Sequence, residues 1–154
     1  MSVYMEVYGE VYFDKKKEAK KALDFLKSED WLREEDGVYK WVSDGYIIEG
    51  EGTPIDADYV CFNGGTMRNI GRVLDYIFSE FKIDKKYTHY RTVCMDGTFS
   101  LGEYREGHVN VSDEEIEAII GCPLSDLDYD DEDEENVCSY RSAEEKAYDW
   151  VLEG

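Results

Sequence analysis

Residues 58–81 read DYVCFNGGTMRNIGRVLDYIFSEF, and this stretch decides the fold that we expect. Its first five residues, 58–62, form a short apolar run that is typical of a β-strand. Asn63-Gly64-Gly65-Thr66 then predicts a turn, with Thr66 as the N-cap of a helix. One apolar stripe at helical spacing follows, formed by Met67, Ile70, Leu74, Ile77, Phe78 and Phe81. The stretch therefore predicts a strand, a tight turn and an amphipathic helix.

The same order of elements occurs upstream, and hairpins follow both helices. Residues 3–13 alternate like a strand, and residues 14–27 predict a helix with Asp14 as its N-cap. Asp44-Gly45 and Asp96-Gly97 each stand between alternating runs, which favours a hairpin, and they lie 52 residues apart. We therefore expect an α+β fold in which two β-α-β-β units form an antiparallel sheet with helices on one face.

Residues 112–154 differ from the body, residues 1–111, mainly in charge. The body carries 21 acidic and 15 basic residues, whereas the C-terminal region carries 16 acidic and 2 basic residues, in a chain of net charge −20. Ser112 with Glu115, and Ser142 with Glu145, have the spacing of capping boxes that begin two helices. Trp150 lies on the apolar stripe of the second helix. We expect an acidic helix-loop-helix region docked on the α+β body.

The connection between these two helices is densely acidic. Eight of the ten residues 126–135 are acidic, and only Leu127 and Tyr129 interrupt them. Charge runs are commonly solvated loops that aid solubility. A fixed row of carboxylates can also occupy the groove of a nucleic-acid-binding protein, because duplex DNA presents one charge per roughly 1.7 Å of axis. The residues that we expect to contact such a partner are Asp126, Asp128, Asp130, Asp131, Glu132, Asp133, Glu134, Glu135 and Tyr129.

These observations favour a non-enzymatic binding protein that engages a basic, nucleic-acid-binding protein by mimicking the nucleic-acid backbone. The sharpest form of this hypothesis is an inhibitor of a host defence nuclease. In size and acidity alone, the chain resembles the nucleic-acid-mimic inhibitors of phages and mobile elements. We expect Tyr129 and Tyr140 to stack against arginine side chains of the partner. The oligomeric state is left open.

The alternative is a regulatory module that binds a divalent cation or a small ligand. Asp126, Asp128 and Asp130 have the spacing of the first ligands of an EF-hand loop. However, Asp131 and Val137 stand where that loop needs glycine and glutamate, which argues against an EF-hand and leaves a looser cation site open.

A small ligand could instead bind at the Gly64-Gly65 turn. A glycine-rich turn between a strand and a helix resembles the arrangement of phosphate-binding loops, and Arg68 and Arg72 stand nearby. The stretch nevertheless matches neither common phosphate-loop pattern, so ordinary turn chemistry is the simpler interpretation.

The predicted helix 14–27 carries a basic face. Its lysines are Lys15, Lys16, Lys17, Lys20 and Lys21. We interpret this as a solvated face that the protein's own acidic loop could neutralise. Direct nucleic-acid binding is disfavoured because the overall charge repels phosphate.

No catalytic, metal or cofactor site is predicted. His89 and Cys94 are five residues apart on one predicted strand, so their side chains point to opposite faces. The sequence does not indicate which carboxylate would pair with His108. The four cysteines form no CxxC pair, and we expect reduced thiols, with Cys61 and Cys94 as small core residues. No apolar run reaches the roughly 20 residues of a membrane span, and the N-terminal residues do not resemble a signal peptide. We therefore expect a cytoplasmic protein.

Overall fold

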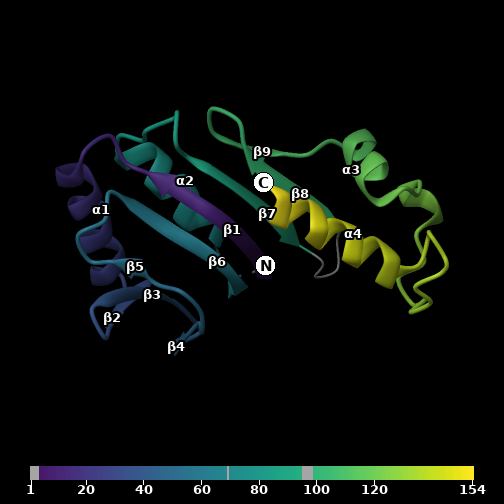
Figure 1. Ribbon diagram of the computed structural model, residues 1–154, viewed down its shortest axis with the longest axis horizontal. Coiled ribbons are helices and arrows are strands. Elements are labelled where there is room, and N and C mark those ends of the chain that lie inside the picture. Colours follow the sequence, from purple (N-terminus) through teal and green to yellow (C-terminus); the bar gives the residue numbers. More distant parts are fainter. Residues whose placement is uncertain (1–3, 69, 95–98) are drawn as a thin grey trace.

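The computed structural model describes residues 4–68, 70–94 and 99–154 (Figure 1). The fold is mixed α+β, as predicted, with antiparallel sheets of five and four strands. The five-stranded sheet contains, in spatial order, β6 (Tyr59–Arg68), β1 (Tyr4–Tyr12), β7 (His89–Cys94), β8 (Ser100–Tyr104) and β9 (His108–Asn110). Cys94 pairs with Ser100, so β7 and β8 form the second predicted hairpin, and its turn, residues 95–97, lies outside the described residues.

The hairpin of the first unit lies in the second sheet instead of joining the first. This sheet contains β2 (Leu32–Glu35), β3 (Val38–Ser43), β4 (Tyr46–Ile47) and β5 (Thr53–Pro54). Both edges of β1 are already occupied, by β6 and β7, so no edge of β1 remains for this hairpin. Asp44 and Gly45 have φ values of 53° and 83°, which confirms the predicted Asp-Gly turn. A second such turn, Asp36-Gly37, joins β2 to β3 and was not predicted.

The predicted turn at residues 63–66 is wrong, because these residues continue strand β6. Thr66 pairs with Glu6 and Asn63 pairs with Tyr8, so Gly64 and Gly65 together face the single residue Val7. This arrangement is a β-bulge, and glycine inside a strand often marks one. Helix α2 (Ile70–Glu80) begins four residues after Thr66, so Thr66 is not its N-cap.

Helices cover both faces of the five-stranded sheet. Helix α1 (Lys16–Ser28) and α2 pack on one face, in a core that includes Val7, Val11 and Tyr90 of the sheet. Helices α3 (Asp113–Ile120) and α4 (Tyr140–Glu153) pack on the other face, against Val93 and Leu101. We call the core beneath α1 and α2 the first core, and the core beneath α3 and α4 the second core. The helices of the two units therefore share one face, and the C-terminal helices occupy the opposite one. The division of the chain at residue 111 stays a prediction, because the second core contains residues from both sides of it.

The helix starts follow the predicted signals with two shifts. Ser112 caps α3, and its side chain accepts a hydrogen bond from the Glu115 N–H, as predicted. Helix α4 begins three residues earlier than predicted, with Ser139 rather than Ser142 as its N-cap. Helix α1 has Lys15 at its N-cap position without a side-chain cap, so the prediction for Asp14 is wrong by one residue. No helix among the described residues is long and apolar enough to cross a membrane.

Candidate functional site

The acidic residues lie together on one ordered connection between α3 and α4. A short 3-10 helix, η1 (Leu124–Asp126), begins this connection, and the segment 126–139, here called the acidic loop, starts at the last residue of η1 and completes it. The acidic loop lies at one end of the longest axis of the molecule (Figure 1). Seven of the eight predicted acids are exposed, and Asp131 is half-buried. Leu127 is buried against the second core and holds the start of the loop to the protein.

A disulfide closes the base of the acidic loop. Cys122 and Cys138 are bonded, with their Cα atoms 5.4 Å apart, so the ring of chain between them contains all eight acids. The expectation of reduced thiols is therefore wrong for this pair. Beside the bond, Asp128 donates its N–H to Cys138 O at 2.8 Å and accepts the Tyr140 N–H at 2.9 Å. These contacts join the two ends of the loop.

Three of the acidic side chains also order the loop from within. The carboxylates of Asp128, Asp131 and Asp133 each accept a backbone N–H from two residues further along, at 3.0, 2.9 and 3.0 Å. The N–H of Asp133, together with the Asn136 amide, lowers the pKa of the Asp131 carboxyl. The Ser139 hydroxyl donates to Asp133 O at 2.6 Å. Because the carboxylates bond to the backbone, the loop is held in one shape while it stays charged.

Few groups near the loop compensate its charge. Arg141 pairs with Glu134 at 2.7 Å and approaches Glu145 at 3.9 Å. Arg141 and Lys146 are the two basic residues of the whole 112–154 region. Tyr129 is 48% exposed and lies 6.1 Å, between ring centroids, from Tyr140. The exposed surface is therefore a dense anionic patch with a tyrosine at its edge.

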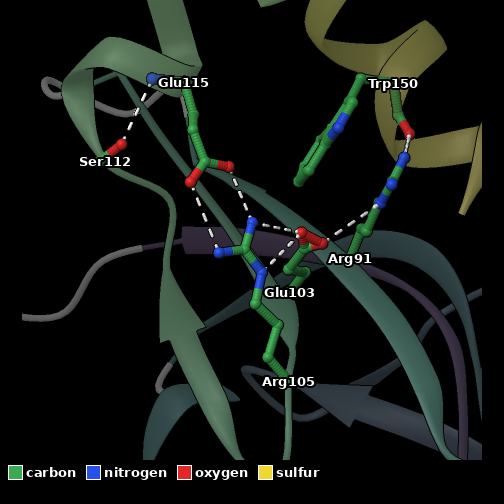
Figure 2. A network of polar contacts seen from close by, with 6 residues as sticks. All are labelled: Arg91, Glu103, Arg105, Ser112, Glu115 and Trp150. Carbon is green, nitrogen blue, oxygen red and sulfur yellow. Dashed lines mark hydrogen bonds and ion pairs between the residues drawn. The ribbon is translucent and has the colours of Figure 1, made fainter.

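A polar network fixes the helices on either side of the acidic loop to the sheet (Figure 2). Arg105, just after β8, donates to Glu103 at 2.8 Å and to Glu115 of α3 at 2.7 Å. This pairing lowers the pKa of the Glu115 carboxyl. On the other side, the Arg91 guanidinium of β7 lies over the Trp150 ring of α4 and donates to Trp150 O. The acidic loop is therefore held between two helices that are themselves joined to the sheet.

The lysine face does not meet the acidic loop. Helix α1 lies at the opposite end of the longest axis, so the internal neutralisation that we considered is wrong (Figure 1). Lys20 pairs instead with Asp24 at 3.5 Å, and Lys21 with Glu18 at 3.8 Å, on the surface of α1 itself. At physiological salt the screening length is about 8 Å, so the two ends act on partners independently.

The alternative sites receive little support from the geometry. Among the described residues, no group of three or more His, Cys, Asp or Glu side chains could hold a metal ion. The Gly64-Gly65 turn proposed for a small ligand does not exist, because these residues belong to β6.

The structure assembles no catalytic group from the residues that we considered. Cys94 is buried, and His89 is exposed at the other end of β7. The Nδ1 atom of His108 lies 2.8 Å from the Tyr90 hydroxyl. Burial lowers the pKa of this histidine and favours a neutral ring. This pair acts as a structural contact between β7 and β9.

The acidic residues are evident in the sequence, but the contacts that order them are not. The pairing of Cys122 with Cys138 was not predicted, although the two cysteines flank the acidic run on both sides. That symmetric placement was the available signal. Comparison with protein-family models, with curated proteins and with solved structures found no match to this chain.

Proposed function

We propose that this protein is a non-enzymatic binding protein whose acidic loop engages a basic, nucleic-acid-binding protein. The observation that carries the proposal is the ordered presentation of eight carboxylates within a loop closed by a disulfide. A loop that only aids solubility needs charge but no fixed shape. A loop that competes with nucleic acid gains affinity when its charges are already ordered, because less freedom is lost on binding.

The proposed mechanism is electrostatic mimicry. The partner's basic groove, which normally holds phosphates, would receive the carboxylates of the acidic loop, and long-range attraction would accelerate association. Tyr129 at the edge of the patch would stack on an arginine of the groove. A nuclease is the sharpest form of such a partner, because occlusion of its groove inhibits it directly.

The disulfide bears on the compartment in which the protein would meet its partner. Disulfides persist in oxidising compartments and are rare in the reduced cytosol. The bond between Cys122 and Cys138 therefore argues against the cytoplasmic location that we expected. A cytoplasmic partner would require the acidic loop to keep its shape through its hydrogen bonds alone.

The experiment is a capture from nuclease-treated lysate with three forms of the oxidised protein. The wild type is compared with a loop variant, in which the eight acids become Asn or Gln, and with a matched control of equal net charge. The control neutralises eight exposed acids elsewhere: Glu29, Glu34, Asp36, Glu49, Asp56, Glu80, Glu114 and Glu153.

The proposal predicts that the wild type and the control retain the same basic protein, which rising salt releases, while the loop variant loses it. Equal capture by all three forms would show that the acidic loop is not the binding surface. Equal loss from both variants would show that net charge alone attracts the protein, without a specific role for the loop.

A further inference from the structure

One part of the five-stranded sheet is left open by the C-terminal helices. Helix α4 crosses in front of β7 and β8, and Tyr8 of β1 packs against the core beneath this helix, whereas no helix lies in front of the far end of β1 or of β6 (Figure 1). The side chains that alternate toward this side along β1 are Tyr8, Glu10 and Tyr12, because Val7 and Val11 point into the first core. All three are partly exposed.

Three tyrosines form a row across this open side. Tyr12 of β1 pairs in register with Tyr59 of β6, and their ring centroids are 5.1 Å apart. Tyr87, two residues before β7, lies 5.9 Å from Tyr12 by the same measure and is 55% exposed. We call Tyr12, Tyr59, Tyr87 and the adjacent Glu10 the tyrosine face.

Glu10 supplies the polar group of the tyrosine face. Its carboxylate accepts the Tyr12 hydroxyl at 2.8 Å and lies 4.0 Å from His89 Nε2. The hydrogen bond from Tyr12 to Glu10 raises the pKa of Tyr12 to about 12. Burial, followed by the charges of Glu10 and Glu51, raises the pKa of the neighbouring Cys61 to about 11. Glu10 contributes to both pKa shifts, so its carboxylate is a negative charge that neighbouring groups on this face sense.

Two kinds of ligand use tyrosine rows on open sheets. Bases of single-stranded nucleic acid stack on such rings, and cationic side chains bind over them. The central carboxylate of Glu10, and the net charge of −20, disfavour a phosphate backbone and favour a cation. The described residues already form this type of contact, with Arg91 over Trp150 at 4.2 Å, Lys86 over Tyr87 at 5.3 Å and Lys27 over Tyr39 at 6.0 Å.

We propose that the tyrosine face binds an arginine side chain of the basic partner, with the guanidinium stacked on the tyrosine rings and hydrogen-bonded to Glu10. This inference rests on the proposed function, since it assigns a second contact to the same class of partner. Arginine suits the site better than lysine because its planar group can stack and donate two hydrogen bonds at once. The ammonium of Lys86 would move from Tyr87 as the arginine arrives.

The test is an NMR titration of the intact, oxidised protein with 13C-labelled tyrosine. The probes are three: a blocked peptide of three Gly-Arg repeats, the same peptide with lysine in place of arginine, and a short oligothymidylate. The inference predicts that the arginine peptide shifts the Tyr12 and Tyr59 signals and binds about threefold more tightly than the lysine peptide. Glu10→Gln and Tyr59→Leu should each weaken this binding by about threefold or more, and Lys86→Ala should preserve it.

The loop variant separates this inference from the proposed function. It should still show the Tyr12 and Tyr59 shifts with the arginine peptide, whatever its behaviour in the lysate capture. Shifts confined to Tyr129 and Tyr140, the absence of shifts, equal binding of the two peptides, or shifts caused by oligothymidylate instead would each overturn the inference. Glu10→Gln is isosteric, so its result stands even where Tyr59→Leu disturbs the sheet.

Discussion

The guanidinium of Arg91 lies 4.2 Å from the centre of the Trp150 ring and also donates a hydrogen bond to Trp150 O. This one pair joins β7, in the middle of the sheet, to the last turns of α4. Because α4 begins where the acidic loop ends, the pair helps to set where the loop points. The proposed function depends on such support, since a patch of charge is selective only if it is held in place.

Loss of the Arg91 side chain should loosen α4. Arg91→Ala removes the ring contact, the bond to Trp150 O and the approach to Glu103 at 3.8 Å. We expect the free energy of unfolding to fall by about 1–3 kcal/mol, measured by urea denaturation. Arg91→Lys is the control, and it should recover only part of the loss because lysine cannot stack as a plane. A change in the free energy of unfolding within about 0.5 kcal/mol for Arg91→Ala would show that the contact does not stabilise the fold.

The disulfide should be detectable chemically and thermodynamically. Under denaturing, non-reducing conditions two thiols, Cys61 and Cys94, should react with a thiol reagent, and four should react after reduction. Replacement of Cys122 and Cys138 by serine should lower the free energy of unfolding by about 3 kcal/mol, because the bond closes a loop of this length in the unfolded chain. Four reactive thiols before reduction would contradict the bond. Cys61→Ser serves as the control that keeps it.

His108 should make the protein less stable in mild acid. Burial lowers the pKa of His108 below its ordinary value of 6.5, so the unfolded chain binds a proton more readily than the folded one. Stability should therefore be lost as the pH falls below 6.5 and through the lower folded value. A hydrogen bond with Asn110 and the charge of Asp75 raise the pKa of His108, and they limit the effect of burial.

The measurement is the free energy of unfolding between pH 7.5 and 5, compared with that of His108→Gln. The glutamine variant should show a flatter profile over this range. Identical profiles for the two proteins would mean that His108 titrates alike in the folded and unfolded states. The carboxylates common to both proteins cancel in this comparison.

Tyr12 should titrate in a way that depends on Glu10. The hydrogen bond between them raises the pKa of Tyr12 to about 12, which places it above the ordinary value of 10. Stability from this contact is present below pH 10 and is lost as the pH rises toward 12. Glu10→Gln should return the pKa of Tyr12 toward 10 in a tyrosine-resolved NMR titration, and Glu6→Gln should leave it in place. An unchanged pKa of Tyr12 in the Glu10→Gln variant would show that this hydrogen bond does not form.

The local elements of this fold could be predicted because their signals are local. The Asp44-Gly45 turn, the Ser112 cap and the apolar stripe of α2 each depend on residues within a few positions of one another. The pairing of strands depends on distant residues. Nothing in residues 38–47 indicates that β1 is already paired on both sides, so the separate second sheet was not foreseen. Gly64-Gly65 was misread because glycine serves turns and bulges equally.

The residues of the candidate site could be predicted from the sequence, but their fixed arrangement could not. The acids of the loop are plain in the sequence, whereas their fixed arrangement depends on the pairing of Cys122 with Cys138 and on Ser139, which bonds back to Asp133. The tyrosine face was missed for a similar reason. Tyr12, Tyr59 and Tyr87 lie far apart in the chain and meet only through the register of β6, β1 and the segment before β7.

The central claim is that the ordered acidic loop is the surface that binds a basic partner. Its most direct test is the rate at which the captured partner associates with the wild type, the loop variant and the matched control of equal net charge, measured over a series of salt concentrations. We predict fast, strongly salt-dependent association for the wild type and the control, and a slower, nearly salt-independent rate for the loop variant. The same rate and the same salt dependence for the wild type and the loop variant would contradict the claim.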